Sequence, residues 1–191
     1  MKSALSKSLL AVFCFSFALS AQTKPIEQGL EPDWDIRPVL KEIAAHAGRL
    51  LPVLDQIDPK AWVAKGASDT YVAQWSSVKA QTEALKAEAL VLANNPEKLS
   101  DALKVYFRMQ SLEYMLNSLD SGIRKYQNTA LADLLARTAA ENGANRNRFQ
   151  RYIEDLSSDR EQQFDIMNHE AQRCRAILVQ QHPEPHKTGR K

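Results

Sequence analysis

The chain has 191 residues, with 25 Lys and Arg against 23 Asp and Glu, and this length suits one domain with a sizeable core. The formal charge of +2 comes from Lys2 and Lys7, since removing these two leaves 23 basic and 23 acidic residues. A neutral remainder disfavours broad binding to nucleic acid or to anionic membranes, which requires an excess of Lys and Arg on one face.

Residues 1–21 have the layout of a secretory signal peptide. Lys2 and Lys7 precede an apolar run at residues 9–19, and small residues follow. We expect cleavage after Ser20 or Ala21 and an exported product, either periplasmic or secreted. A retained membrane anchor is the alternative, but the run is far shorter than the ~20 apolar residues that span a bilayer. We expect no transmembrane segment in the mature chain.

An extended lead-in and a first helix come next. Residues 22–35 contain Pro25, Gly29 and Pro32 without helical periodicity, and Trp34 is expected to dock this lead-in. From residue 36 the apolar side chains recur at helical spacing: Ile36, Leu40, Ile43, Ala47, Leu50 and Leu54. Pro52 should kink this helix or end it early, because its ring clashes with the carbonyl four residues back. Residues 60–65 are expected to form a short helical turn that carries Trp62.

Two long helices are predicted on either side of Asn94, Asn95 and Pro96. The helix from residue 68 alternates steps of three and four through Tyr71, Trp75, Val78, Thr82, Leu85, Ala89 and Leu92. Residues 99–123 carry a narrow stripe at the same spacing: Ala102, Val105, Met109, Leu112, Leu116, Leu119 and Ile123. These patterns are typical of core-facing bundle helices, and the short connection makes the two helices antiparallel neighbours.

The last third of the chain predicts one or two further helices and then a fifth. A seam that starts at residue 128 runs through Leu131, Leu135, Thr138, Asn142, Asn145, Phe149, Tyr152 and Leu156. Gly143, in its polar middle, indicates either a bend or a break. Ser158 and Glu161 have capping-box spacing, which predicts a new helix with the seam Phe164, Met167, Ala171, Cys174 and Leu178. Residues 183–191 are expected to be a disordered polar tail.

Together these patterns predict an all-α, up-and-down bundle of four to five helices in a single domain over residues 36–182, preceded by the extended lead-in. Only Cys174 remains after signal cleavage, so no intramolecular disulfide is expected. Its position in a seam favours a buried structural thiol over a reactive one.

Polar residues interrupt an apolar face of two predicted helices at one level of the bundle. In residues 99–123 a second face, which begins with Leu99, Leu103 and Tyr106, turns polar from Gln110 onwards, and the seam that starts at residue 128 turns polar at Asn142 and Asn145. Antiparallel packing of the helix over residues 99–123 against the helix that starts at residue 128 sets Glu113 opposite about Glu141. This predicts a polar layer inside the bundle or a cleft at that level, with Arg146 and Arg148 near its rim. The candidate residues are Gln110, Glu113, Asn117, Asn142, Asn145 and Arg146. Mutual hydrogen bonding that fixes helix register is the favoured interpretation, and a ligand pocket or a wet or covered face are the alternatives.

A metal site is a weaker hypothesis. Glu42 and His46 are four residues apart, as are Asp165 and His169, so each pair shares a helix edge. If the two edges faced each other, two imidazoles and two carboxylates could bind a divalent ion. The spacing differs from the Glu-x-x-His of di-iron bundles, and solvated pairs are the favoured interpretation.

The sequence does not specify a reaction. Phosphate-binding loops, nucleophile motifs, zinc cysteine pairs and the C-x-x-C-H haem motif are all missing from the sequence, so we expect neither catalysis nor a cofactor. The favoured hypothesis is an exported, non-catalytic helical bundle that binds a protein partner or has a structural role in the cell envelope. A carrier of a small molecule, haem or metal is the alternative.

Overall fold

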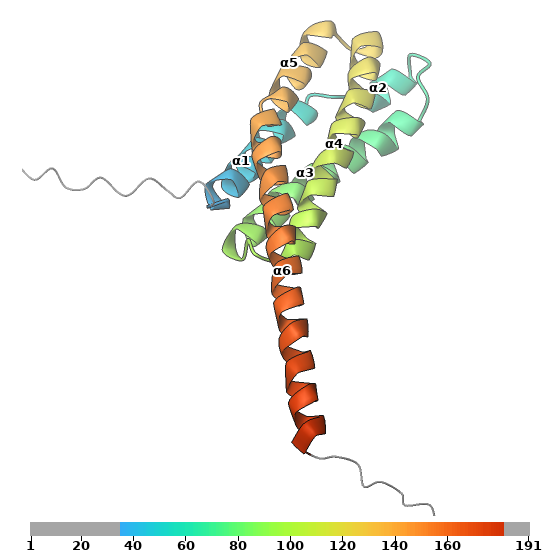
Figure 1. The fold of residues 1–191 in the computed structure, drawn as a ribbon. Coiled ribbons are helices and arrows are strands. Elements are labelled where there is room, and N and C mark those ends of the chain that lie inside the picture. The colour runs from blue at the N-terminus through green and yellow to red at the C-terminus, as the bar shows by residue number, and fades with distance from the viewer. Residues whose placement is uncertain (1–34, 182–191) are drawn as a thin grey trace, which may run out of the picture. The chain divides into compact units, whose positions relative to one another are not determined.

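The computed structural model describes residues 35–181, and this part of the chain forms helices without a strand (Figure 1). Five longer helices are joined by short turns: α1 (Arg37–Leu54), α3 (Thr70–Asn94), α4 (Leu99–Tyr126), α5 (Thr129–Ala140) and α6 (Gly143–Gln181). Between α1 and α3 lies the five-residue helix α2 (Pro59–Val63). The predicted all-α bundle is confirmed. The predicted signal peptide, nearly all of the lead-in and the polar tail lie outside the described residues.

The core forms where α4 packs on α3, α5 and the first part of α6, while α1 packs on α3, α5 and α6. All seven residues of the stripe predicted for α4 are buried. The predicted stripe of α1 is also buried, from Ile36 to Leu54. Since burial of apolar surface is the main favourable term in folding, these two stripes account for much of the stability of the bundle. Within the described residues, no helix combines the length and apolarity that crossing a bilayer requires.

An ion-pair cluster joins α3 to α4. Nε of Arg108 lies 2.6 Å from one carboxylate oxygen of Glu88, and Nζ of Lys104 lies 2.8 Å from the other. Arg108 also donates a hydrogen bond to Gln81. Burial by itself would raise the pKa of the Glu88 carboxyl, but the hydrogen bonds and charges of Arg108 and Lys104 outweigh burial and hold that pKa below its ordinary value.

An aromatic cluster closes the end of the bundle that α2 covers. The indole of Trp62 is 1% exposed, meets Tyr71 edge-on and stacks on Tyr126. Its Nε1 donates to the side-chain oxygen of Gln127 at 3.1 Å, so the buried indole N–H is satisfied. Gly122 of α4 lies directly beneath this cluster: a Cβ there would stand 2.9 Å from Trp62 and 2.8 Å from Tyr71.

Two breaks that the sequence left open are decided by the structure. The helix α1 includes Pro52 and ends two residues later at Leu54. Near Gly143 the chain breaks: α5 ends at Ala140, and α6 begins at Gly143 after a turn. In that turn the backbone N–H of Glu141 donates to the carbonyl of Thr138, which closes α5.

The predicted start of a new helix at Ser158 is wrong, because α6 continues through that point to Gln181. From residue 161 to residue 180 every side chain of α6 is exposed. The prediction of a buried thiol is wrong as well, since Cys174 is exposed, and Phe164 and Met167 are 68% and 69% exposed. A helical seam shows which face is apolar, but another element must cover that face to bury it.

Candidate functional site

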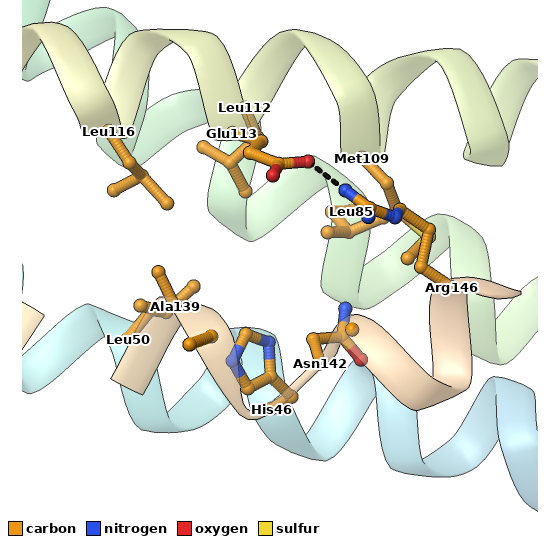
Figure 2. Close-up of a pocket in the computed structure, with 12 residues that line it drawn as sticks. His46, Leu50, Leu85, Met109, Leu112, Glu113, Leu116, Ala139, Asn142 and Arg146 are labelled. Carbon is orange, nitrogen blue, oxygen red and sulfur yellow. Dashed lines mark hydrogen bonds and ion pairs between the residues drawn. The ribbon is translucent and has the colours of Figure 1, made fainter. Parts of the chain in front are cut away.

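A pocket lies between α1 on one side and α4 on the other, where the chain breaks between α5 and α6 (Figure 2). Its cavity volume is about 270 Å³. The walls are mostly apolar, and a few polar side chains stand among them. The lining residues are His46, Leu50, Leu85, Met109, Leu112, Glu113, Leu116, Ala139, Ala140, Asn142, Gly143 and Arg146. Apolar walls with few polar groups are typical of small-molecule sites.

His46 is the most informative of these residues. It comes from α1, is 3% exposed, and has one ring nitrogen, Nε2, only 2.7 Å from the carbonyl oxygen of Thr138. A carbonyl oxygen can only accept a hydrogen bond, so Nε2 carries the proton, and in the neutral ring Nδ1 is then an acceptor. This Nδ1 is buried and has no hydrogen-bond partner among the described residues. A buried polar atom without a partner costs stability unless something else satisfies it.

The polar rim of the pocket comes from α4, from α6 and from the turn that precedes α6. The carboxylate of Glu113 pairs with the guanidinium of Arg146 across the opening (Figure 2). Asn145 donates a hydrogen bond of 3.3 Å to the side-chain oxygen of Asn142. In Figure 2, His46 and Asn142 stand on one side of the pocket, and Leu112, Glu113 and Leu116 on the other. The rim is thus a set of paired polar groups above an apolar interior.

The six predicted polar residues gather at one level, but none of them is buried. Of the two arrangements that the sequence predicted, the structure shows a cleft. Glu113, Asn142 and Arg146 line the pocket, whereas Gln110 and Asn117 line a second hollow that shares Glu113 and Arg146 with it. Gln110 donates at 2.9 Å to the hydroxyl of Tyr106. Glu113 contacts Arg146, five positions beyond the predicted Glu141, because α5 and α6 are separate helices.

The residues predicted for a metal site lie in two separate places. His46 lines the pocket, and Glu42 on the same helix pairs with Arg49 at 2.8 Å. Asp165 and His169 lie on the exposed part of α6. Within residues 35–181 no three His, Cys, Asp or Glu side chains are grouped in a way that could hold a metal ion. The structure therefore does not bring the two pairs together.

Sequence reasoning missed the part that His46 plays in this pocket. The signal was present in its spacing, since His46 follows Ile43 by three residues and precedes Leu50 by four, which places it on the apolar face of α1. The sequence could not show that Nδ1 is unpaired, because this depends on the contact of the other ring nitrogen with Thr138, a residue 92 positions away.

Comparison with protein-family models, curated proteins and solved structures finds no match for this chain. Among the described residues that line the pocket there is no hydroxyl or thiol side chain that could act as a nucleophile. The arrangement is suited to holding a molecule by apolar contact, and His46, whose Nδ1 has no partner among the described residues, lies in the wall of the pocket.

Proposed function

We propose that this chain is an exported, non-catalytic helical bundle that binds a small apolar molecule in the pocket between α1 and α4. The observation that supports the proposal is the buried, unpartnered Nδ1 of His46, a residue that lines this mostly apolar pocket. A ligand with one N–H or O–H donor would satisfy that nitrogen and would remove the cost of leaving it buried and unpaired.

The size of the cavity narrows the class of ligand. A volume of about 270 Å³ exceeds the ~150 Å³ of an engineered apolar cavity that binds benzene, so a single substituted ring or a short-chain alcohol fits. The walls of Leu50, Leu85 and Leu112 favour a hydrocarbon body. Arg146 is already paired with Glu113, which disfavours a ligand that needs a strong cation.

A matched pair of probes tests the proposal. Phenol and toluene have nearly the same shape, but only phenol can donate a hydrogen bond. We expect phenol to bind the purified protein and to raise its melting temperature. In His46→Leu the ratio of phenol to toluene affinity should fall about fivefold to tenfold, because the acceptor is lost. Isothermal titration calorimetry measures both affinities.

A second variant separates loss of the site from loss of the fold. Leu116→Phe adds volume inside the cavity and should weaken both probes equally, while circular dichroism verifies that each variant remains helical. Failure of the wild-type protein to bind either probe would refute the proposal. An unchanged phenol to toluene ratio in His46→Leu would show that Nδ1 does not receive the ligand.

Binding of a protein partner, or a structural role in the cell envelope, is the second candidate function. It is favoured by a different observation, the apolar side chains that α6 exposes beyond residue 160. Phe164, Met167 and Leu178 are each more than half exposed. Exposed apolar groups that follow one helical seam are typical of a docking surface. A change in the mass of the native particle, measured by light scattering, tests this candidate.

A further inference from the structure

The second half of α6 projects from the bundle, and its first residues, as far as Asp165, line hollows together with residues of the other helices. We call residues 161–180 the α6 extension; in Figure 1 it runs in orange to red beyond the other described helices. All twenty of its residues are exposed. A helix of this length measures about 30 Å, and most helices gain their stability from an apolar face that packs on something.

The extension carries a regular coiled-coil seam. Steps of three and four residues join its members, which are Phe164, Met167, Ala171, Cys174 and Leu178. In heptad notation they occupy alternating a and d positions, the pattern that pairs two helices with a slight left-handed supercoil. Ile166 and Val179 are also exposed but lie outside the seam, at c and b. The seam therefore defines one face of the extension on which a second helix fits.

The charges beside the seam distinguish between orientations of a second copy. With Phe164 at a, Glu170 is at g and Arg175 is at e, five residues later. In a parallel pair of identical helices, each g residue lies beside the e residue five positions later in the partner, so Glu170 meets Arg175 twice. An antiparallel pair centred near residue 169 would instead bring Glu170 beside its own copy, although it would also place Glu161 near Arg175 of the other copy. The other e and g positions of the extension are Glu161, Gln163, Asn168 and Ile177, and in the parallel pair they add no like-charge contact.

We propose that the α6 extensions of two copies of this chain pair in parallel through the seam of Phe164, Met167, Ala171, Cys174 and Leu178. This inference rests on the second candidate function, protein binding by α6, and names the partner. A membrane surface fits less well, because the extension holds three acidic residues against two arginines, whereas interfacial helices are rich in Lys and Arg.

The position of Cys174 gives the pairing a chemical readout. In a parallel pair a d residue faces its own copy across the axis. With helix axes 8–10 Å apart and Cα atoms on a radius of about 2.3 Å, facing Cα atoms are separated by roughly 3.4–5.4 Å. The upper part of that range overlaps the Cα separations at which a disulfide forms. The exposed Cys174 of one copy is thus placed to react with Cys174 of the other.

Matched substitutions test the surface. Met167→Asp and Leu178→Asp place a charge in the seam, while Ile166→Asp and Val179→Asp place the same charge one residue away, outside it. Analytical ultracentrifugation of the full chain should show a concentration-dependent dimer for the wild type and for the two outside variants. The two seam variants should be monomeric. A monomeric wild type, or a dimer that survives Met167→Asp, would overturn the proposal.

Exchange of the two charges tests the orientation. Glu170→Arg and Arg175→Glu should each weaken the dimer, and the double variant should restore it, because the pair is then reversed but still complementary. Restoration is not expected in an antiparallel dimer or when α6 binds residues 1–34 of its own chain or an unrelated protein. Single and double variants that all dimerise equally would contradict the parallel register.

Oxidation provides an independent readout. Oxidised glutathione, a disulfide, accepts the two electrons and two protons that two Cys174 thiols lose as one S–S bond forms, and it leaves as two reduced glutathione molecules. The wild type should yield a covalent dimer on a non-reducing gel, and Met167→Asp should yield far less. A dimer in solution that does not cross-link would show that the helices are not parallel. If the protein is monomeric and yet binds phenol, the inference fails while the pocket proposal stands.

Discussion

Gly122 offers the sharpest test of the packing, because the close approach of α4 to the aromatic cluster depends on its missing side chain. A Cβ at this position would stand 2.8 Å from Cε1 of Tyr71 and 2.9 Å from Cζ3 of Trp62, well inside ordinary van der Waals contact. Tyr71 is half-buried and can shift, but Trp62 is 1% exposed and its indole is held by Gln127. The Gly122→Ala variant must therefore displace a buried ring.

The expected magnitude follows from two opposing effects. Overpacking of a core costs about 1–3 kcal/mol, whereas Ala in place of Gly inside a helix stabilises by roughly 0.5–1 kcal/mol. Gly48 provides the matched control, since it lies within α1 and its added Cβ would meet only the flexible end of Lys86, at 4.0 Å. Gly48→Ala should therefore gain only the stability that Ala adds over Gly inside a helix. The free energy of unfolding of Gly122→Ala should thus lie about 1–3 kcal/mol below that of Gly48→Ala.

Urea denaturation followed by circular dichroism measures this difference, and helix propensity cancels between the two variants. Equal stability of Gly122→Ala and Gly48→Ala would mean that the Trp62 and Tyr71 rings do not restrict the space at residue 122. Near-ultraviolet circular dichroism adds a local readout, since displacement of the Trp62 ring changes the aromatic signal only in Gly122→Ala.

Three further predictions concern stability. Glu88→Gln should lower the free energy of unfolding by about 1 kcal/mol at neutral pH. Because the pKa of Glu88 is lowered in the folded state, this loss of stability should shrink as the pH falls below the ordinary carboxyl value of 4.5. A loss that stays constant down to pH 3 in urea titrations would contradict the ion pair. Gln127→Leu should cost about 1–3 kcal/mol in guanidinium unfolding, because Trp62 loses its acceptor, and an unaltered midpoint would argue against that bond. Removal of residues 161–191 should shift the melting temperature of a dilute sample by less than about 3 °C, since residues 161–180 are exposed. A large drop in melting temperature measured by calorimetry would mean that these residues pack on the bundle.

The buried stripes of the bundle could be predicted because they depend on local spacing. In α4 every residue from Ala102 to Ile123 that the three-four spacing selects is buried, and in α3 the same holds from Val78 to Leu92. A helix turns by a fixed angle per residue, so sequence spacing alone decides which side chains share a face. The level at which the polar residues gather followed from the same geometry together with one short turn.

The candidate site was only partly predictable. The rim residues Glu113 and Asn142 stood out as polar interruptions of apolar helix faces, and Arg146 was expected near them. The apolar interior did not stand out, since Leu50 and Leu85 look like any other core residues until the five helices that line the pocket are placed around them. The unpaired nitrogen of His46 depends on the carbonyl of Thr138, and no local pattern records such a contact.

The sequence by itself determined the helical class, the apolar face of each helix and the polar level. Only the tertiary structure decided whether each face is covered. The seam of Phe164, Met167 and Leu178 has the same spacing as the seam of α3, and yet the α3 seam is buried from Val78 to Leu92 while the seam of the α6 extension is exposed. The physical reason is that periodicity is a property of one helix, whereas burial is a property of two.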